Sequence, residues 1–326
     1  MSSHSTPRAT LTPPPPSNDG AVDLPDLRPG SRWAQYGIVR EIGRGGFSVV
    51  YEAEDRLLHR RVALKLLGGD KYDSRQRQLA FLSEAQSAAR LISPYIVVLL
   101  EADLHRGHPF LAFEYMPRGD LKAELASNGP LDPDRACFLL GQIALALQEL
   151  HEAGLKHRDI KPSNCFLDRN GNAKLGDLGL ARGSLEQGLD GSNEARVVFG
   201  TPTYMAPEQI LGTTDIRSDI YGLGATFYEL LCGEPPYDGP DAQTVAAQVL
   251  AGPPPPLADR APQLPSCLID LIEHMMARQT QARFDEPAEI VEVLREIGPL
   301  DLSPRTTRRA HRQEHRTTSA HQPAPS

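Results

Sequence analysis

The spacing of apolar residues changes about a third of the way along this chain, and that change limits the folds open to it. Between Tyr36 and Glu114 the apolar residues fall in short β-rich runs, broken by one helical stretch. From Leu121 onward their spacing is helical. Because 326 residues can bury one large or two medium cores, we predict an α+β fold of two lobes, the first small and β-rich, the second larger and α-helical.

The same pattern gives approximate positions for the elements. The predicted strands are residues 38–42, 49–53, 62–67, 96–100 and 110–113. The predicted helices are residues 74–91, 132–153, 218–232, 243–251 and 265–278. In the first helix we expect one shared apolar face, formed by Leu79, Leu82, Ala85, Ala88 and Ala89.

The two ends of the chain differ in composition from the body. Residues 1–32 are rich in Pro and Ser, cannot bury enough apolar surface to offset their ordering entropy, and are predicted to be a disordered leader. The run Pro13 to Pro16 could instead be a polyproline ligand for a partner. Residues 299–326 are predicted to be a disordered basic tail. The body, residues 33–298, would divide into an N-lobe at 33–115 and a C-lobe at 116–298.

Charge and cysteine content exclude several classes of protein. The formal net charge of -8 argues against a nucleic-acid-binding body, because phosphate backbones attract basic surfaces. The four cysteines are far apart and form no C-x-x-C pair, which fits a reducing compartment without disulfides or zinc. No apolar run is long enough to span a bilayer, and the polar start shows no secretory signal. We therefore expect a soluble, cytoplasmic protein.

The segment from His157 to Asn164, with Asp177 thirteen residues further on, carries the clearest chemistry. Asp159 is the candidate base that orients a substrate hydroxyl and accepts its proton, and Lys161 would neutralise charge on a transferred phosphoryl group. Asn164 and Asp177 would hold Mg²⁺ through hard oxygen ligands. His157 could be mistaken for a general base, but its place before Arg-Asp fits a packed structural histidine better.

A possible nucleotide clamp lies upstream. Glycines in a hairpin let the backbone lie close over phosphates, although such a hairpin alone is weak evidence. Lys65 stands inside an apolar strand, where it must be paired or pay a heavy desolvation penalty. Glu84 on the following helix is its expected partner, and together they would orient the α- and β-phosphates. The hairpin is formed by Gly43, Arg44, Gly45, Gly46, Phe47, Ser48, Val49 and Val50.

These motifs occur in the order typical of one family. The glycine loop, Val62-Ala63-Leu64-Lys65, the helix Glu84, His157-Arg158-Asp159-x-Lys161-x-x-Asn164, Asp177-Leu178-Gly179 and Ala206-Pro207-Glu208 follow one another along the chain. From Tyr36 to Ile297 the chain therefore resembles the protein-kinase family. The resemblance implies the bilobal protein-kinase fold, with ATP and Mg²⁺ as cofactors.

The resemblance also implies roles for further residues. Glu114 and Met116 fall at the interlobe hinge, where backbone groups would read adenine, with Phe113 as the gatekeeper. Asp120 would touch ribose or simply cap a helix. Val50, Ala63 and Phe166 would line the nucleotide site. In the C-lobe, Glu208 would pair with Arg283, and Asp219 would brace the catalytic loop.

Two details resemble the serine/threonine class of this family. Lys161 followed by Pro162 is typical of that class, and Thr201 matches the threonine that packs against the catalytic Asp and Lys. The implied function is transfer of the γ-phosphoryl group of ATP to Ser or Thr of protein substrates in signalling, with autophosphorylation and possible self-association. The compact, Arg-rich chain resembles bacterial members.

Some features depart from the family pattern. Leu178 stands where Phe is usual, a packing position at which an apolar residue should still work. Arg158 usually receives a phosphorylated residue, yet the segment leading to Glu208 offers few acceptors, and we predict weak dependence on its phosphorylation. The remaining acceptors are Ser184, Ser192 and Thr203, with Glu194 as a permanent acid. A binding-only pseudokinase and a small-molecule phosphotransferase are the competing functions; the catalytic residues disfavour the first and Ala206-Pro207-Glu208 the second.

Overall fold

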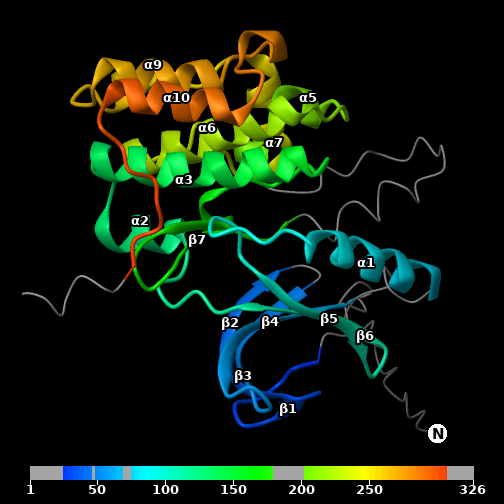
Figure 1. Cartoon of the computed structure of the whole chain (residues 1–326). Helices are drawn as coiled ribbons and strands as arrows, with labels where there is room; N and C mark the ends of the chain where they lie inside the picture. The colour runs from blue at the N-terminus through cyan, green and yellow to red at the C-terminus, as the bar shows by residue number, and fades with distance from the viewer. Residues whose placement is uncertain (1–24, 46–47, 69–74, 179–201, 307–326) are drawn as a thin grey trace, which may run out of the picture.

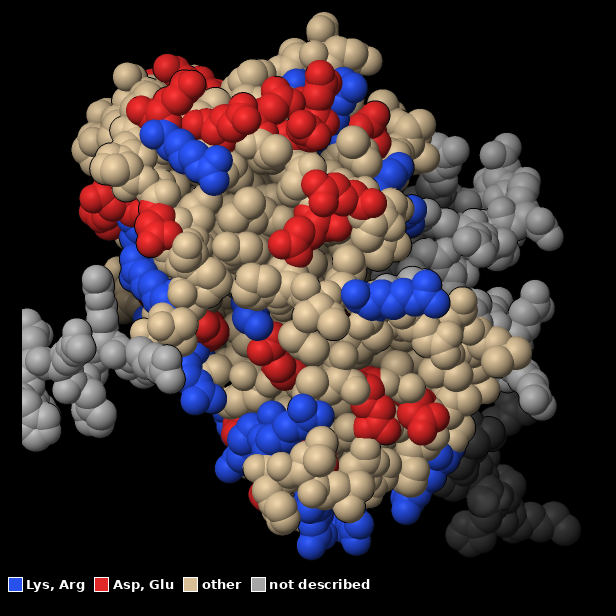
Figure 2. All heavy atoms as spheres, viewed as in Figure 1, with Lys and Arg blue, Asp and Glu red and all other residues tan. Residues whose placement is uncertain are grey.

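The computed structural model describes residues 25–45, 48–68, 75–178 and 202–306. They form the predicted two lobes, with a curled sheet and one helix in the N-lobe and a helical C-lobe (Figure 1). In Figure 2, acidic side chains gather over α9 and α10 at the top of the C-lobe, and basic ones over the strands at the lower end of the N-lobe. The lobes thus differ in charge as well as in architecture.

The N-lobe sheet has the strand order β1-β2-β3-β4-β6-β5, and each neighbouring pair is antiparallel. In β4, Val62, Leu64 and Leu66 are fully buried in the lobe's core, while the alternate residues Ala63 and Lys65 face the other side. This alternation puts Lys65 on the face opposite the core. The strands are β1 Arg32–Trp33, β2 Tyr36–Gly45, β3 Ser48–Asp55, β4 Arg60–Leu67, β5 Leu99–His105 and β6 His108–Glu114.

One predicted strand is misplaced. Instead of residues 96–100, β5 covers Leu99–His105. Ile96 and Val97 are buried against the C-lobe, where Ile96 forms a parallel bridge with Leu175 and the Val97 N–H donates to the Leu175 carbonyl at 2.9 Å. Their apolar character therefore serves contact with the C-lobe and not the N-lobe sheet.

The N-lobe helix, α1 (Arg75–Ala88), lies within the predicted range, but its buried face differs from the expected one. Phe81, Ala85 and Ala88 are buried, whereas Leu79 is 58% exposed. Both sets have helical spacing and both contain Ala85 and Ala88, while the predicted Leu82 is partly buried against the same core. Periodicity alone could not choose between them, and the bulkier Phe81 occupies the core.

Helices α3, α6, α9 and α10 form the body of the C-lobe (Figure 1). Asp132 caps α3 by accepting hydrogen bonds from the Asp134 and Arg135 N–H groups, as the Asp-Pro signal predicts. The helices are α2 Leu121–Asn128, α3 Pro133–Glu152, α5 Pro207–Ile210, α6 Ile216–Cys232, α7 Ala242–Ala251, α8 Leu257–Arg260, α9 Ser266–Met275 and α10 Pro287–Ile297. A short hairpin, β7 Cys165–Leu167 and β8 Ala173–Leu175, lies on the side of the C-lobe that faces the N-lobe (Figure 1).

At both ends the described residues continue past the predicted boundaries of the body. In the predicted leader, the Leu27 N–H donates to the Tyr51 hydroxyl, which itself donates to the Pro25 carbonyl at 3.0 Å. In the predicted tail, residues 299–306 lie against α3, and we call them the C-terminal strap. Its Leu302 is buried in the C-lobe core because Gly141 on α3 leaves room for it. Residues 1–24 and 307–326 lie outside the described ranges.

Within those ranges, none of the helices combines the length and apolar character that crossing a bilayer requires.

Candidate active site

The catalytic loop lies between α3 and β7 and brings three predicted residues together. Lys161 Nζ lies 3.0 Å from Asp159 Oδ2. The Asn164 amide donates to the Asp159 carbonyl at 2.8 Å and reaches Asp159 Oδ2 at 3.3 Å. Because Asn164 is almost fully buried, these contacts hold the amide in one orientation. The loop thus presents a carboxylate with a cation and an amide on the same oxygen.

The β7–β8 hairpin places Asp177 beside this loop. Cys165 pairs with Leu175 across the hairpin, and the Gly176 N–H donates to the Asn164 carbonyl at 2.9 Å. Asp177 follows directly, with a left-handed φ of 55° that is uncommon outside glycine. Asn164 and Asp177, thirteen residues apart in the sequence, therefore lie at the two ends of one hairpin.

Gly176 is a site residue that the sequence analysis missed. A Cβ built there would lie 2.8 Å from the Phe166 ring and 2.9 Å from the Val97 side chain, closer than real atoms approach. Only glycine lets this backbone pass between them on its way to Asp177. The signal in the sequence was a glycine directly before the Asp-x-Gly motif.

Lys65 is paired, as its place in an apolar strand predicts, and the described partner is Asp177. Its ammonium donates to Asp177 Oδ1, which ties the N-lobe sheet to the C-lobe hairpin. Burial acts to raise the pKa of Asp177, but the charge and hydrogen bond of Lys65, together with His157 and Lys161, hold that pKa below its ordinary value. Glu84, the expected partner, belongs to α1, and its side chain lies outside the described residues.

The glycine hairpin joins β2 to β3 as predicted. Gly43 pairs with Val50 and Gly45 with Ser48, so the strands run antiparallel up to the turn. Val50 in turn pairs with Lys65 on β4, which places the hairpin next to the Lys65 end of the sheet. Arg44 forms an ion pair with Glu41 on its own strand. The turn residues Gly46 and Phe47 lie outside the described part of the chain.

The hinge follows β6 and carries the predicted adenine-reading residues. Phe113 is buried and pairs with Ala63 across the sheet, and Met116 is buried as well. The sequence analysis assigned a role only to the backbone of Glu114, but its side chain has a role as well. Its carboxylate accepts hydrogen bonds from the Val98 N–H at 2.9 Å and from Lys174 on β8 at 2.6 Å, so it joins the two lobes behind the hinge.

Asp120 and Phe166 lie together just beyond the hinge, where they form an isolated antiparallel bridge. The Asp120 carboxylate accepts a hydrogen bond from the Ala123 N–H at 2.9 Å and caps α2. Of the two roles left open for Asp120, the structure displays the helix cap. Phe166 is partly buried, and its ring packs toward Gly176.

Asp219 on α6 braces the catalytic loop, as the family resemblance implies. It is almost fully buried and accepts hydrogen bonds from the backbone N–H groups of His157 at 2.9 Å and Arg158 at 2.7 Å. His157 is completely buried, with its Nε2 3.0 Å from the Gly176 carbonyl, which supports the structural interpretation of this histidine. The loop is therefore held from both sides.

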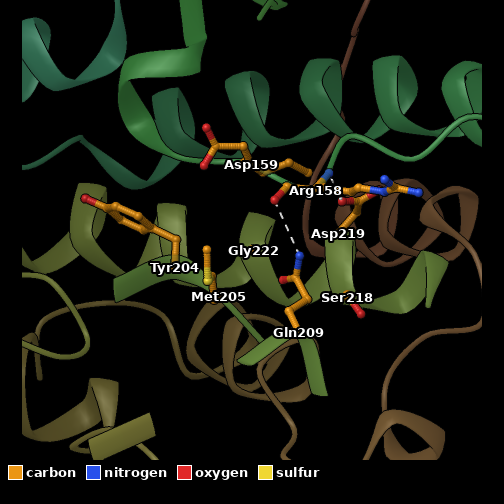
Figure 3. Close-up of a pocket in the computed structure, with 9 residues that line it drawn as sticks. Arg158, Asp159, Tyr204, Met205, Gln209, Ser218, Asp219 and Gly222 are labelled. Carbon is orange, nitrogen blue, oxygen red and sulfur yellow. Dashed lines mark hydrogen bonds between the residues drawn. The ribbon is translucent and has the colours of Figure 1, made fainter. Parts of the chain in front are cut away.

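The pocket beneath the loop is drawn in Figure 3. Gln209 reaches up to the Arg158 carbonyl, while the Asp159 carboxylate points away from Gln209 toward the other side of the loop. Tyr204 and Met205, directly before Ala206-Pro207-Glu208, line the same pocket. The segment that ends in Glu208 is thus packed against the loop that carries Asp159.

Glu208 and Arg283 form the predicted ion pair in its strongest geometry. Two parallel hydrogen bonds of 2.7 and 2.9 Å join the guanidinium to the carboxylate, and the Ser218 hydroxyl adds a third at 2.6 Å. Burial acts to raise the pKa of Glu208, but the hydrogen bonds from Arg283 and Ser218 and the charge of Arg283 together lower that pKa. Arg283 also lies over the Tyr221 ring.

Other predictions concern single positions. Leu178 is buried, in keeping with a packing position, and Cys165 is fully buried, which raises the pKa of its thiol far above the ordinary value. Cys165 is therefore a small core residue and not a reactive thiol. Thr203 is partly buried. Thr201, Ser184, Ser192 and Glu194 lie outside the described residues.

Comparison with known proteins agrees with this geometry. The protein kinase domain model matches residues 36–294. The chain is 37% identical over 257 residues to serine/threonine-protein kinase PknD of Mycobacterium tuberculosis, covering 78% of this chain and 38% of PknD. It is 35% identical over 261 residues to PknB of Mycolicibacterium smegmatis, covering 78% of this chain and 42% of PknB. The solved kinase domain of M. tuberculosis PknI superposes with a TM-score of 0.64 at 26% identity, over 83% of this chain and 99% of that one.

A bilobal fold with this catalytic loop defines a phosphotransferase of the kinase type. The chain belongs to the protein kinase family, and the two curated relatives named above are bacterial serine/threonine kinases. It spans about two fifths of the length of those curated relatives.

Proposed function

We propose that this chain is an ATP-dependent serine/threonine protein kinase that acts in signalling and phosphorylates itself. The observation that carries the proposal is a pair of linked contacts: Lys65 binds Asp177, Asn164 binds Asp159, and the backbone hydrogen bond from Gly176 to Asn164 joins the two. Phosphoryl transfer requires a base, a metal site and a cation for the phosphates, and these four side chains supply all three.

The residues present fit a magnesium nucleotide. Asn164 and Asp177 offer an amide and a carboxylate oxygen, the hard ligands that Mg²⁺ takes in small number while it keeps phosphate and water oxygens. In the described part of the chain there is no group of three His, Cys, Asp or Glu that could cage a metal alone, which matches this mode of binding. When bound, Mg²⁺ neutralises charge on the phosphates of ATP. Lys65 would bind the α- and β-phosphates.

The protein's own residues would then act on the acceptor. Asp159 orients the Ser or Thr hydroxyl of a protein substrate and takes its proton as the oxygen attacks the γ-phosphorus. Lys161 lies on the same Asp159 oxygen and would neutralise charge on the transferred group. Asp219 and Asn164 hold the loop still, so the base needs no reorganisation. We place the reaction in the cytoplasm, since all four cysteines are free thiols.

The test uses radiolabelled ATP, Mg²⁺ and a generic basic protein. We expect label transfer by the wild type, and a loss of about 10²–10⁴-fold in Asp159→Asn, because the proton acceptor is removed. Lys65→Met should also lose transfer. Asp270→Asn, at an exposed position on α9, is the matched control and should keep full activity. Equal label in the wild type and Asp159→Asn would refute the proposal and favour a binding-only role.

A further inference from the structure

Three arginines from separate parts of the chain converge beside the turn between β7 and β8. A Cβ built at Gly171 in this turn would lie 2.8 Å from Arg118 Nη1 and 3.2 Å from Arg135 Nη2. The Arg305 guanidinium lies 4.1 Å from the centre of the Phe138 ring, and that of Arg135 lies 5.8 Å from the same ring. We call Arg118, Arg135 and Arg305 the arginine cluster. Figure 2 shows basic side chains at this edge of the C-lobe, near the end of the described chain.

The carboxylates around the arginine cluster leave its positive charge largely uncompensated. The closest approach is 3.9 Å, between Arg118 and Glu124. Asp168 also faces Arg135, but its oxygens accept hydrogen bonds of 2.7 to 2.9 Å from the backbone and side-chain amides of Asn170 and Asn172. Among the described residues, no carboxylate comes within 4.0 Å of the Arg135 or Arg305 guanidinium.

Arg135 lies where a cation is unfavourable. It belongs to the first turn of α3, where the helix dipole already contributes positive charge. Burial lowers the pKa of Arg135, and the neighbouring Arg305 and Arg118 lower it further, while Glu124 and Asp168 act the other way. Like charges held together in a half-buried position indicate a site that an anion would stabilise.

The C-terminal strap delivers one threonine to this site. Asn172 accepts a hydrogen bond from the Arg305 N–H at 2.8 Å and donates one to the Arg305 carbonyl at 3.1 Å. Upstream, buried Gln142 donates to the Leu302 carbonyl at 3.2 Å. The strap is therefore fixed up to Arg305, and the next residue in the chain, Thr306, is exposed.

We propose that Thr306 is a phosphorylation site and that its phosphate is bound by Arg118, Arg135 and Arg305. The assignment of Thr306 as a phosphorylation site rests on the kinase function proposed above. The enzyme in this reaction is a second copy of the chain. The Thr306 Oγ1 attacks the γ-phosphorus of ATP, the bond to the β–γ bridging oxygen breaks, and ADP leaves. The hydroxyl proton passes to Asp159 of the acting copy, and the product is a phosphate monoester of about two negative charges.

Ser303 is the other hydroxyl residue of the strap. It is a poor candidate for phosphorylation because an acidic residue contacts it. Its N–H donates to the Asp301 carboxylate at 3.0 Å, and hydrogen bonding from the Ser303 side chain, with this backbone contact, lowers the pKa of Asp301. A phosphate on Ser303 would therefore face a negative carboxylate. Thr306 directly follows Arg305 of the arginine cluster, and a phosphate there would gain charge-assisted hydrogen bonds from guanidinium groups.

The first arm of the test asks whether Thr306 is modified. Full-length Asp159→Asn protein serves as an inactive substrate for wild-type enzyme with ATP and Mg²⁺, and phosphorylated residues are identified by mass spectrometry. We expect phosphate on Thr306 and its loss in Asp159→Asn combined with Thr306→Val. Phosphate at other residues but not at Thr306 overturns the proposal and leaves the kinase function standing.

The second arm asks where the phosphate binds and does not depend on kinase activity. A full chain that carries phosphothreonine at position 306, made by ligation, is compared with the unmodified chain by hydrogen exchange. We expect at least tenfold slower exchange in residues 302–306 and in the turn at 168–172. Arg135→Gln should abolish this gain, whereas Arg295→Gln on the exposed face of α10 should keep it. Unchanged exchange, or a gain that survives Arg135→Gln, overturns the proposal.

Discussion

Two ion pairs join distant parts of this molecule, and they differ in almost every physical respect. Lys65 and Asp177, 112 residues apart, connect the lobes through one side-chain contact, and the Asp177 side chain is 41% exposed. We call these two residues the inter-lobe pair. Glu208 and Arg283, 75 residues apart, lie within the C-lobe and share two parallel hydrogen bonds. The Arg283 side chain is fully buried and makes further bonds to the backbone carbonyls of Ala277, Arg217 and Arg278.

The Lys65–Asp177 contact can be exchanged for other partners, whereas the Glu208–Arg283 contact cannot. Asp177 and Lys65 each have a second partner in the proposed function, the metal and the phosphates of a nucleotide. The C-lobe pair, Glu208 and Arg283, has no comparable second partner. Removal of Arg283 would leave the Glu208 carboxylate inside the C-lobe with the Ser218 hydroxyl as its remaining side-chain partner. We therefore expect the C-lobe pair, Glu208 and Arg283, to determine stability and the inter-lobe pair, Lys65 and Asp177, to determine activity.

The largest effect on stability should come from Arg283→Met. Loss of one partner of a buried pair costs about 3–5 kcal/mol, because the remaining charge stays desolvated. Urea unfolding would measure this, with Arg295→Met on the exposed face of α10 as the control that removes an arginine without a buried partner. A cost no larger than that of the control would contradict the assigned role of the C-lobe pair.

Gly176→Ala should rank second. The added methyl group would meet the Phe166 ring and Val97, and overpacking of this kind costs about 1–3 kcal/mol. The matched control is Gly43→Ala, where the nearest atom to a new Cβ is 3.9 Å away. Equal unfolding free energies for the two variants would show that the backbone before Asp177 has more room than the structure gives it.

Lys65→Met should change stability least among the substitutions. Ion pairs with an exposed partner contribute about 0–1 kcal/mol, and methionine preserves most of the apolar contact of the lysine stem. The unfolding midpoint should stay close to that of the wild type even as phosphoryl transfer is lost. A cost that matches Arg283→Met would abolish the distinction between the two pairs.

The pH dependence of the C-lobe pair is the finest test of the comparison. The pKa of Glu208 is lower in the folded protein than in the unfolded chain, so its stabilisation is complete above the unfolded value. It is lost as the pH falls through the folded value. The difference in unfolding free energy between wild type and Arg283→Met should therefore narrow as the solution is acidified below the ordinary pKa of glutamate. A constant difference would show that Glu208 does not titrate with the pair.

Local motifs predicted much of the candidate site from sequence. Lys65, Asp159, Asn164 and Asp177 were identified from residue type and spacing, since the chemistry of phosphoryl transfer restricts both. The structure adds that one hairpin brings the last two together. Their catalytic roles remain predictions that the experiments above address.

Contacts between distant segments were beyond the reach of periodicity. Leu302 looks like part of a polar tail until Gly141 on α3 provides the space it fills. Ile96 and Val97 look like a strand, yet they pack against Leu175 of the other lobe. In each case the deciding partner lies many residues away, so no local pattern could have revealed it.

The most direct test of the account is the affinity for ATP with and without Mg²⁺, measured by calorimetry on wild type and Asp177→Asn. We predict that Mg²⁺ strengthens binding to the wild type by at least tenfold and has little effect on Asp177→Asn, while affinity without the metal is not reduced. Asp270→Asn, the control on α9, should behave as the wild type. An equal gain from Mg²⁺ in wild type and Asp177→Asn would contradict the claim that Lys65 and Asp177 exchange their mutual contact for the phosphates and metal of a nucleotide.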